Sequence, residues 1–167
     1  MRTLLTIILA VLFHSTIFGV GNPDRIIYNG KEYELLQIIR FPMEGYFAKY
    51  PEKRRSPNVL CSRGGFVTTF ELINNQLYIN ELKEFVRDNT NERKLKSVFN
   101  ELFPDQESVK ADWITDNFLF PYGNKKFGSR YEQYIFLIIE NGNLIVEKRL
   151  NHIEYRKLRR VNFLRPI

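Results

Sequence analysis

The chain has 167 residues, of which 44% are hydrophobic, and it carries 25 lysine and arginine residues against 19 aspartate and glutamate residues. A chain of this size most simply forms one domain, with a core large enough to fold without disulfides or a structural metal. One cysteine and two histidines exclude an internal disulfide and a four-ligand zinc site.

The first 21 residues have the composition of a secretory signal peptide. Arg2 gives a basic start, residues 4–13 are strongly apolar, and small residues allow cleavage after Gly19 or Gly21. An uncleaved membrane anchor is the alternative, but His14 interrupts the apolar run before it reaches the roughly 30 Å thickness of the hydrocarbon layer. We therefore predict export to the periplasm or the extracellular space, with residues 22–167 as a single domain.

The basic charge is concentrated at the C-terminal end of the chain. Residues 148–167 contain seven basic residues and one acidic residue, a net charge of +6, whereas residues 22–147 have a net charge of −1. The body of the domain is therefore expected to be nearly neutral, and electrostatic attraction to a partner is expected at the C-terminal end.

Residues 24–35 predict a short β-hairpin, because the pair Asn29-Gly30 suits a type I′ turn, in which both central residues have a positive φ. Residues 43–50, between two prolines, predict a short helix. Its apolar residues are spaced i, i+3, i+4 and i+7 and so share one face: Met43, Tyr46, Phe47 and Tyr50.

A second hairpin is predicted over residues 66–82, because two runs rich in β-branched and aromatic residues flank Asn74-Asn75. Residues 88–92 are polar and resemble the start of a calcium loop, but a solvated turn explains them better, since Arg93 stands where the loop needs glycine. The chain is then expected to form a helix at 94–103, a strand at 110–115 and an irregular segment at 116–130.

Residues 134–139 are six apolar residues without interruption, which is typical of a strand covered on both faces. Asn141-Gly142 and residues 143–149 complete a third Asn-turned hairpin, so we expect residues 134–139 to form the central strand. The whole pattern predicts an α+β fold, a curled antiparallel sheet of Asn-turned β-hairpins with two or three short helices.

Residues 151–164 predict a C-terminal amphipathic helix that begins at Asn151, a favourable N-cap residue. Its apolar side is expected to pack against the sheet, and it consists of Leu150, Ile153, Leu158, Val161 and Leu164. The opposite, basic side consists of Arg156, Arg159 and Arg160. This basic side has three interpretations: a solvated helix face, a contact surface for an anionic partner and, third, a contact with nucleic acid.

Several segments together resemble a family of small exported bacterial proteins to which no activity is attached. The resemblance implies export from a bacterium and a single small domain, and it brings no catalytic residue. The segments that carry it are 27–35, 42–47, 63–78, 110–113 and 128–134.

The segment 113–131 is the candidate binding site, because it combines aromatic and basic side chains in a region broken by proline and glycine. The alternative is that its aromatic side chains belong to the core or cap an open end of the sheet. The candidate residues are Trp113, Phe118, Phe120, Tyr122, Lys125, Lys126, Phe127, Arg130 and Tyr131.

Enzymatic chemistry has one candidate, the carboxylates of Asp112 and Asp116 on either side of Trp113. Two carboxylates beside an aromatic platform are the arrangement that glycoside hydrolysis uses, so a small carbohydrate-active hydrolase is the alternative function. A dyad of Cys61 and His152 is not expected, because nothing in their spacing indicates that they meet.

We predict a non-enzymatic module that binds a protein or an envelope component, with an anionic surface as a further candidate partner. No metal ion, cofactor or nucleic acid is expected: metal ligands are few, and no stacking aromatic residues interleave the basic residues of the tail. The sequence does not define an oligomeric state.

Overall fold

The structure, a computed structural model, describes residues 23–37, 39, 42–54, 66–87, 89, 92–126, 128 and 130–162. The predicted signal peptide, Cys61 and Phe127 lie outside the described residues.

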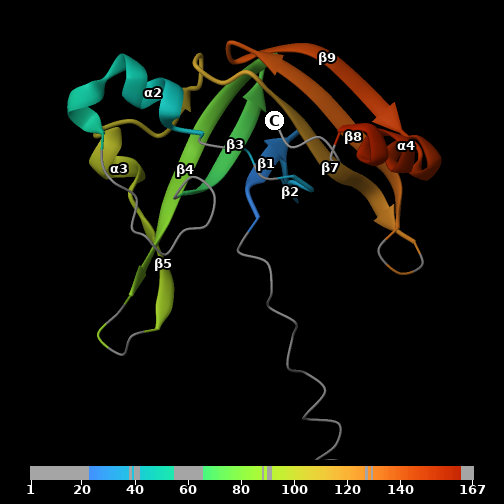
Figure 1. Cartoon of the computed structure of the whole chain (residues 1–167), viewed down its shortest axis with the longest axis horizontal. Coiled ribbons are helices and arrows are strands. Elements are labelled where there is room, and N and C mark those ends of the chain that lie inside the picture. The colour runs from blue at the N-terminus through green and yellow to red at the C-terminus, as the bar shows by residue number, and fades with distance from the viewer. Residues whose placement is uncertain are drawn as a thin grey trace, which may run out of the picture.

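Nine strands within this part of the chain form one curled sheet (Figure 1). The order along the sheet is β2-β1-β3-β4-β9-β8-β7, and β5 and β6 both pair with β4 outside this path. The strands are β1 (Arg25–Tyr28), β2 (Lys31–Glu34), β3 (Val67–Ile73), β4 (Gln76–Arg87), β5 (Arg93–Ser97), β6 (Val109–Lys110), β7 (Asp116–Lys125), β8 (Tyr131–Glu140) and β9 (Asn143–Leu150).

Three α-helices accompany the sheet in the described ranges: α2 (Glu44–Lys49), α3 (Phe99–Leu102) and α4 (His152–Asn162). A turn of 3₁₀ helix, η1 (Pro51–Lys53), follows α2. Figure 1 shows α2 and α3 together at one end of the molecule and α4 at the other. None of these helices combines the length and the apolar character needed to cross a membrane.

The α+β class is confirmed, whereas the predicted all-antiparallel sheet is wrong at one pair of strands. β1 and β3 run parallel, with Ile26 opposite Phe70. Parallel neighbours need a long connection, and the chain between β2 and β3 contains α2 and η1. This connection returns the chain so that β3 can lie beside β1 in the same direction, and the sheet is therefore mixed.

Antiparallel neighbours β1–β2, β3–β4 and β8–β9 are each joined by a two-residue turn. The central residues of these turns all have a positive φ, between 49° and 71°. Asparagine and glycine occupy these positions because they adopt the left-handed conformation at the lowest cost. The residues are Asn29, Gly30, Asn74, Asn75, Asn141 and Gly142.

Three predicted elements are wrong. The strand expected at 110–115 is reduced to β6, which ends at Lys110, and residues 111–115 form no strand. The helix expected at 94–103 is replaced by β5, which pairs with the second half of β4, and by the short helix α3. The segment expected to be irregular at 116–130 contains the ten-residue strand β7. β7 ends the sheet path and pairs only with β8, so it tolerates Pro121, which cannot donate a backbone hydrogen bond.

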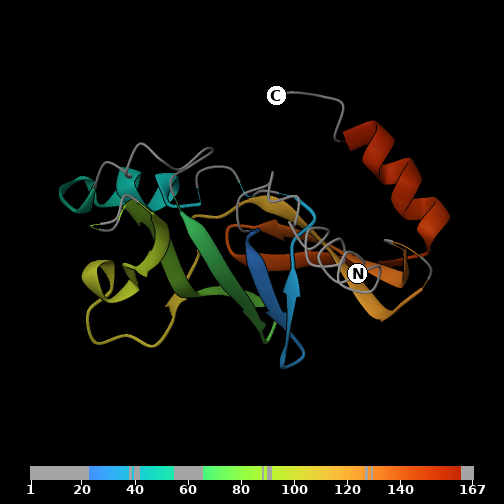
Figure 2. The ribbon, with the colours of Figure 1, turned by 90° about the horizontal axis from the view of Figure 1, so that it is seen from below.

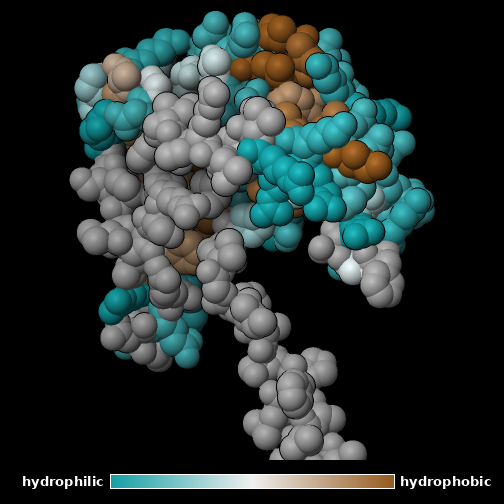
Figure 3. Space-filling model, turned by 45° about the vertical axis from the view of Figure 1, so that its right-hand side comes forward, coloured by the Kyte–Doolittle hydropathy of each residue, from teal (hydrophilic) through white to brown (hydrophobic). Residues whose placement is uncertain are grey.

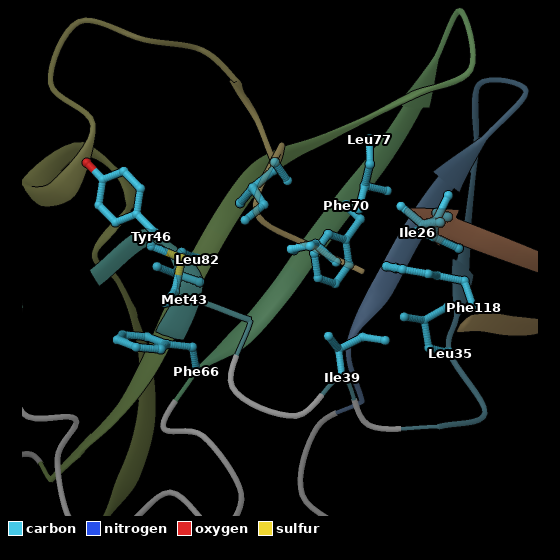
Figure 4. Close-up of a cluster of buried hydrophobic side chains, with 14 of the residues drawn as sticks. Ile26, Leu35, Ile39, Met43, Tyr46, Phe66, Phe70, Leu77, Leu82 and Phe118 are labelled. Carbon is cyan, nitrogen blue, oxygen red and sulfur yellow. The ribbon is translucent and has the colours of Figure 1, made fainter. Parts of the chain in front are cut away.

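The apolar core lies inside the curl (Figure 4). Phe70 on β3 meets Phe118 on β7 edge to face, with ring centroids 5.0 Å apart. Ile135, Leu137 and Ile139 of β8 enter the same cluster, and all three side chains are fully buried. The predicted run 134–139 is thus a strand with one face in the core, although it is next to the last strand of the sheet path.

The two ends of the sheet path meet, which encloses the core. The backbone N–H of Leu36, just after β2, donates to the carbonyl oxygen of Leu119 on β7 at 2.8 Å. The ring of Tyr33 on β2 packs against the rings of Phe120 and Tyr122 on β7, with centroid distances of 5.2 Å and 5.8 Å. The curl therefore brings the first hairpin against strand β7, far away in the sequence.

A buried carboxylate holds the first strand in place. Asp24 is 4% exposed, and its two carboxylate oxygens accept the backbone N–H groups of Thr68 at 2.8 Å and Ile39 at 3.2 Å. Its own carbonyl oxygen accepts the N–H of Leu35 at 2.9 Å. Burial raises the pKa of Asp24 to about 6, despite the two N–H donors that favour the charged form.

This raised pKa predicts a pH-dependent stability. Because the folded-state pKa of about 6 exceeds the ordinary value of 3.8, the native state binds the proton more tightly. The contribution of Asp24 is therefore complete below about pH 4 and is lost as the pH rises through about 6, a loss of about 3 kcal/mol. Urea denaturation of the wild type and of Asp24→Asn at several pH values tests this. Between about pH 4 and the range above pH 6, the free energy of unfolding of the wild type should fall by about 3 kcal/mol more than that of Asp24→Asn. Parallel curves for the two proteins would contradict the assignment.

A second prediction concerns Gly142, which has a φ of +70°. A Cβ atom at this position would lie 2.6 Å from the carbonyl oxygen of Ala111 and 2.9 Å from the Cα atom of Asp112. We expect Gly142→Ala to lower the free energy of unfolding by about 2–4 kcal/mol. Gly30→Ala is the matched control, because Gly30 has a φ of +71° but no atom within 4 Å of such a Cβ. It should lose only about 1 kcal/mol, and equal losses in both variants would show that the close contact is unimportant.

Candidate binding surface

The structure does not bring the predicted binding residues of segment 113–131 together on one surface. Phe118 and Phe120 are 0% exposed and belong to the core, so they are not available to a partner. Their strand alternates: these two residues point inward and Leu119 lies on the other face. The interpretation of both phenylalanines as contact residues is therefore wrong, and the core alternative holds for them.

Trp113 joins α2 to the sheet. Its indole N–H donates to the carbonyl oxygen of Pro42 at 2.8 Å, and its ring lies 5.0 Å from that of Tyr46 on α2. A Cβ atom on Gly45 would lie 2.9 Å from the Cβ atom of Trp113, so only glycine allows this approach. The half-buried Trp113 thus has a packing role that accounts for its position.

Tyr122 lies near the line where the two ends of the sheet meet. Its ring is 6.2 Å from that of Tyr28, and the guanidinium of Arg149 lies over it at 5.6 Å. Tyr28 is held by a hydrogen bond that its hydroxyl donates to Glu147 at 2.7 Å. Tyr122 is half-buried and contributes mainly to the closure of the curl.

The remaining predicted residues lie near the connection between β7 and β8. Lys125, Lys126 and Arg130 are exposed, and Tyr131 is half-buried. The backbone N–H of Lys126 donates to the carbonyl oxygen of Arg130 at 2.8 Å, which closes this connection. Three basic side chains therefore form a small exposed group, separated along β7 from Trp113.

The two candidate catalytic carboxylates have different surroundings. Asp112 is exposed and forms an ion pair with Lys49 at 3.2 Å. Asp116, at the start of β7, accepts the backbone N–H of Asn117 at 2.7 Å. Neither residue lines the polar cleft beside α3, and the two carboxylates make contacts with different parts of the structure.

That polar cleft has a volume of about 660 Å³ and lies beside α3. This cleft could not be predicted from the sequence, because its walls depend on the pairing of β4 with β5, where a helix was expected. The lining residues are Asn80, Glu81, Ser97, Phe99, Asn100, Pro104, Asp105, Gln106 and Glu107. Among the residues that the structure describes, no group of three or more acidic, histidine or cysteine side chains could hold a metal ion.

Helix α4 begins with a reciprocal cap. The side-chain oxygen of Asn151 accepts the N–H groups of Ile153 at 2.9 Å and Glu154 at 3.0 Å. The carboxylate of Glu154 in turn accepts the N–H of Asn151 at 2.8 Å. This arrangement stabilises the start of the helix and uses the only acidic side chain of α4.

The helix packs on the outer face of β8 through aromatic side chains. Tyr155 stacks on Tyr134, with ring centroids 4.0 Å apart and an interplanar angle of 6°. The ring nitrogen Nδ1 of His152 lies 3.4 Å from the Tyr134 hydroxyl. The half-buried side of α4 therefore consists of His152, Tyr155 and Leu158, at positions i, i+3 and i+6.

This orientation corrects the predicted packing face. Ile153 was expected to face the sheet but is 67% exposed. Leu158 is half-buried, the side chain of Val161 is not described, and Leu164 lies outside the described residues. The helix is turned so that Ile153 points away from β8. Residues three, four and seven positions later in a helix lie on the same side, so Arg156, Lys157 and Arg160 also point away from β8. We call these four residues, Ile153, Arg156, Lys157 and Arg160, the outward face of α4.

The outward face carries concentrated positive charge. Arg156, Lys157, Arg159 and Arg160 are all exposed. The ion pairs found within the described ranges do not include any of them. Figure 2 shows α4 rising away from the sheet beyond its contact with β8. On this side of the molecule apolar side chains gather in small groups within a mostly hydrophilic surface (Figure 3).

Comparisons with models of protein families, with curated proteins and with solved structures find no match to this chain. The resemblance to exported bacterial proteins therefore stays a prediction.

Proposed function

We propose that this chain is a non-enzymatic, exported binding domain that holds an anionic partner against the outward face of α4. The observation that carries the proposal is a group of exposed basic side chains at positions i+3, i+4 and i+7 from the exposed Ile153, none of which forms an ion pair with another residue of the described ranges. The partner is an envelope component or a protein, as the sequence predicts, and it contributes phosphate or carboxylate groups.

The charge distribution supports attraction at this place. The body of the domain has a net charge of −1 over residues 22–147, and the last twenty residues have a net charge of +6. Exposed charges are screened beyond about 8–10 Å at ordinary salt, so a partner responds to the local charge rather than to that of the whole domain. Glu154 is the only acidic side chain of α4, and it is held in the cap at the start of the helix by the N–H of Asn151, so the charged side chains of the following turns are all basic.

The predicted signal peptide supports the location. An exported domain encounters anionic headgroups, acidic glycans and other exported proteins, whereas it rarely encounters nucleic acid. The outward face also lacks aromatic side chains for stacking on bases, which disfavours single-stranded nucleic acid as the partner.

The direct test is retention on a cation-exchange resin at low salt. The variant Arg156→Glu/Lys157→Glu/Arg160→Glu reverses three charges on the outward face. The control Lys125→Glu/Lys126→Glu/Arg130→Glu makes the same change in net charge at the connection between β7 and β8. We expect the α4 variant to elute at clearly lower salt than the control, because clustered charges dominate the contact.

Both variants should keep the unfolding transition of the wild type, since all six side chains are exposed. Equal elution of the two variants would contradict the proposal. Earlier elution of the control would instead move the contact surface to the connection between β7 and β8, within the predicted segment 113–131.

A further inference from the structure

The outward face of α4 combines an apolar side chain with a frame of basic ones. Ile153 is 67% exposed, and Arg156, Lys157 and Arg160 follow it on the same side of the helix. A single exposed isoleucine is ordinary on a protein surface. The unusual feature is its position at one end of a basic stripe, on a helix that stands away from the body of the domain.

We infer that the anionic partner of this face is the surface of a phospholipid bilayer with anionic headgroups, an inference that rests on the proposed function. A bilayer offers a plane of phosphate groups with an apolar layer directly beneath it. The basic side chains reach the phosphates, and Ile153 enters the boundary of the acyl chains.

The arrangement of α4 favours a flat, extended partner. The four residues of the outward face span about 10 Å along the helix axis, and α4 lies at the end of the molecule opposite α2 and α3 (Figure 1). The outward face lies opposite the side of α4 that packs on β8, and its four side chains are exposed, so it can face a planar surface. The chain continues after α4 with Phe163, Leu164 and Arg165, which have the same mixture of apolar and basic character.

An acidic protein or glycan would use the basic side chains but not need the isoleucine. If the partner is a bilayer, Ile153 must contribute to binding in addition to the basic side chains. Three basic residues and one apolar side chain give a weak and reversible attachment, which high salt should release.

The experiment uses the chain without residues 1–21 and vesicles that sediment in the centrifuge. One set contains phosphatidylcholine alone and the other contains equal parts of phosphatidylcholine and phosphatidylglycerol. We expect the wild type to sediment only with the anionic vesicles. Arg156→Glu/Lys157→Glu/Arg160→Glu should weaken this partitioning about 100-fold, and Ile153→Asn should weaken it about tenfold while leaving retention on the cation-exchange resin unchanged.

Ile145→Asn is the matched control, because Ile145 on β9 is 55% exposed but lies outside the outward face. It should sediment like the wild type. Retention of the wild type on the resin without sedimentation would overturn the bilayer inference and leave the proposed function standing. Sedimentation of Ile153→Asn equal to that of the wild type would also overturn it, since the isoleucine would then not enter the bilayer. If the wild type neither binds the resin nor sediments with the anionic vesicles, both proposals are overturned.

Discussion

The curl of the sheet is the constraint on which the other features of this fold depend. Strands β2 and β7, at the two ends of the sheet path, are joined by the hydrogen bond from Leu36 to Leu119 and by the packing of Tyr33 on Phe120. The curl brings inner side chains of β1, β3, β4, β7 and β8 into one enclosed core. It also explains the buried Asp24, whose carboxylate ties the start of the first hairpin to β3 and to Ile39 where the curl closes.

The same curl determines where α4 lies. Once Ile135, Leu137 and Ile139 fill the interior, Tyr134 on β8 points to the outer face and needs a cover of its own. Tyr155 supplies this cover by stacking on it in a nearly parallel arrangement. An aromatic pair buries more apolar surface than a single aliphatic side chain, so it fixes the rotation of the helix. Ile153 and the basic side chains then face solvent as a consequence of packing on the opposite side.

Local turn chemistry and apolar runs allowed much of the fold to be predicted from the sequence. Asn29-Gly30, the buried run 134–139 and the apolar stripe of residues 43–50 all have short-range signals. β5 and β7 could not be recognised in this way, because Leu95 follows a helical spacing until β4 offers it a partner strand, and Pro121 normally indicates a break.

Less of the candidate site than of the fold could be predicted from the sequence, because the site also depends on contacts between distant segments. Aromatic residues in a proline-containing segment have the same composition whether they form a loop or a core strand, and only the pairing of β7 with β8 placed Phe118 and Phe120 inside. The helical wheel identified the basic side of α4 but not its rotation. Tyr155 was not counted among the apolar residues, and its partner Tyr134 lies on a different element.

The rotation of α4 can be measured directly by the accessibility of single thiols. In a Cys61→Ser background, Ile153→Cys and Leu158→Cys place one thiol on each side of the helix, and their rates of alkylation in the native protein can be compared. The packing of Tyr155 on Tyr134 predicts rapid labelling of Ile153→Cys and clearly slower labelling of Leu158→Cys. Faster labelling of Leu158→Cys would show that the helix packs through Ile153 and would contradict the proposed contact surface.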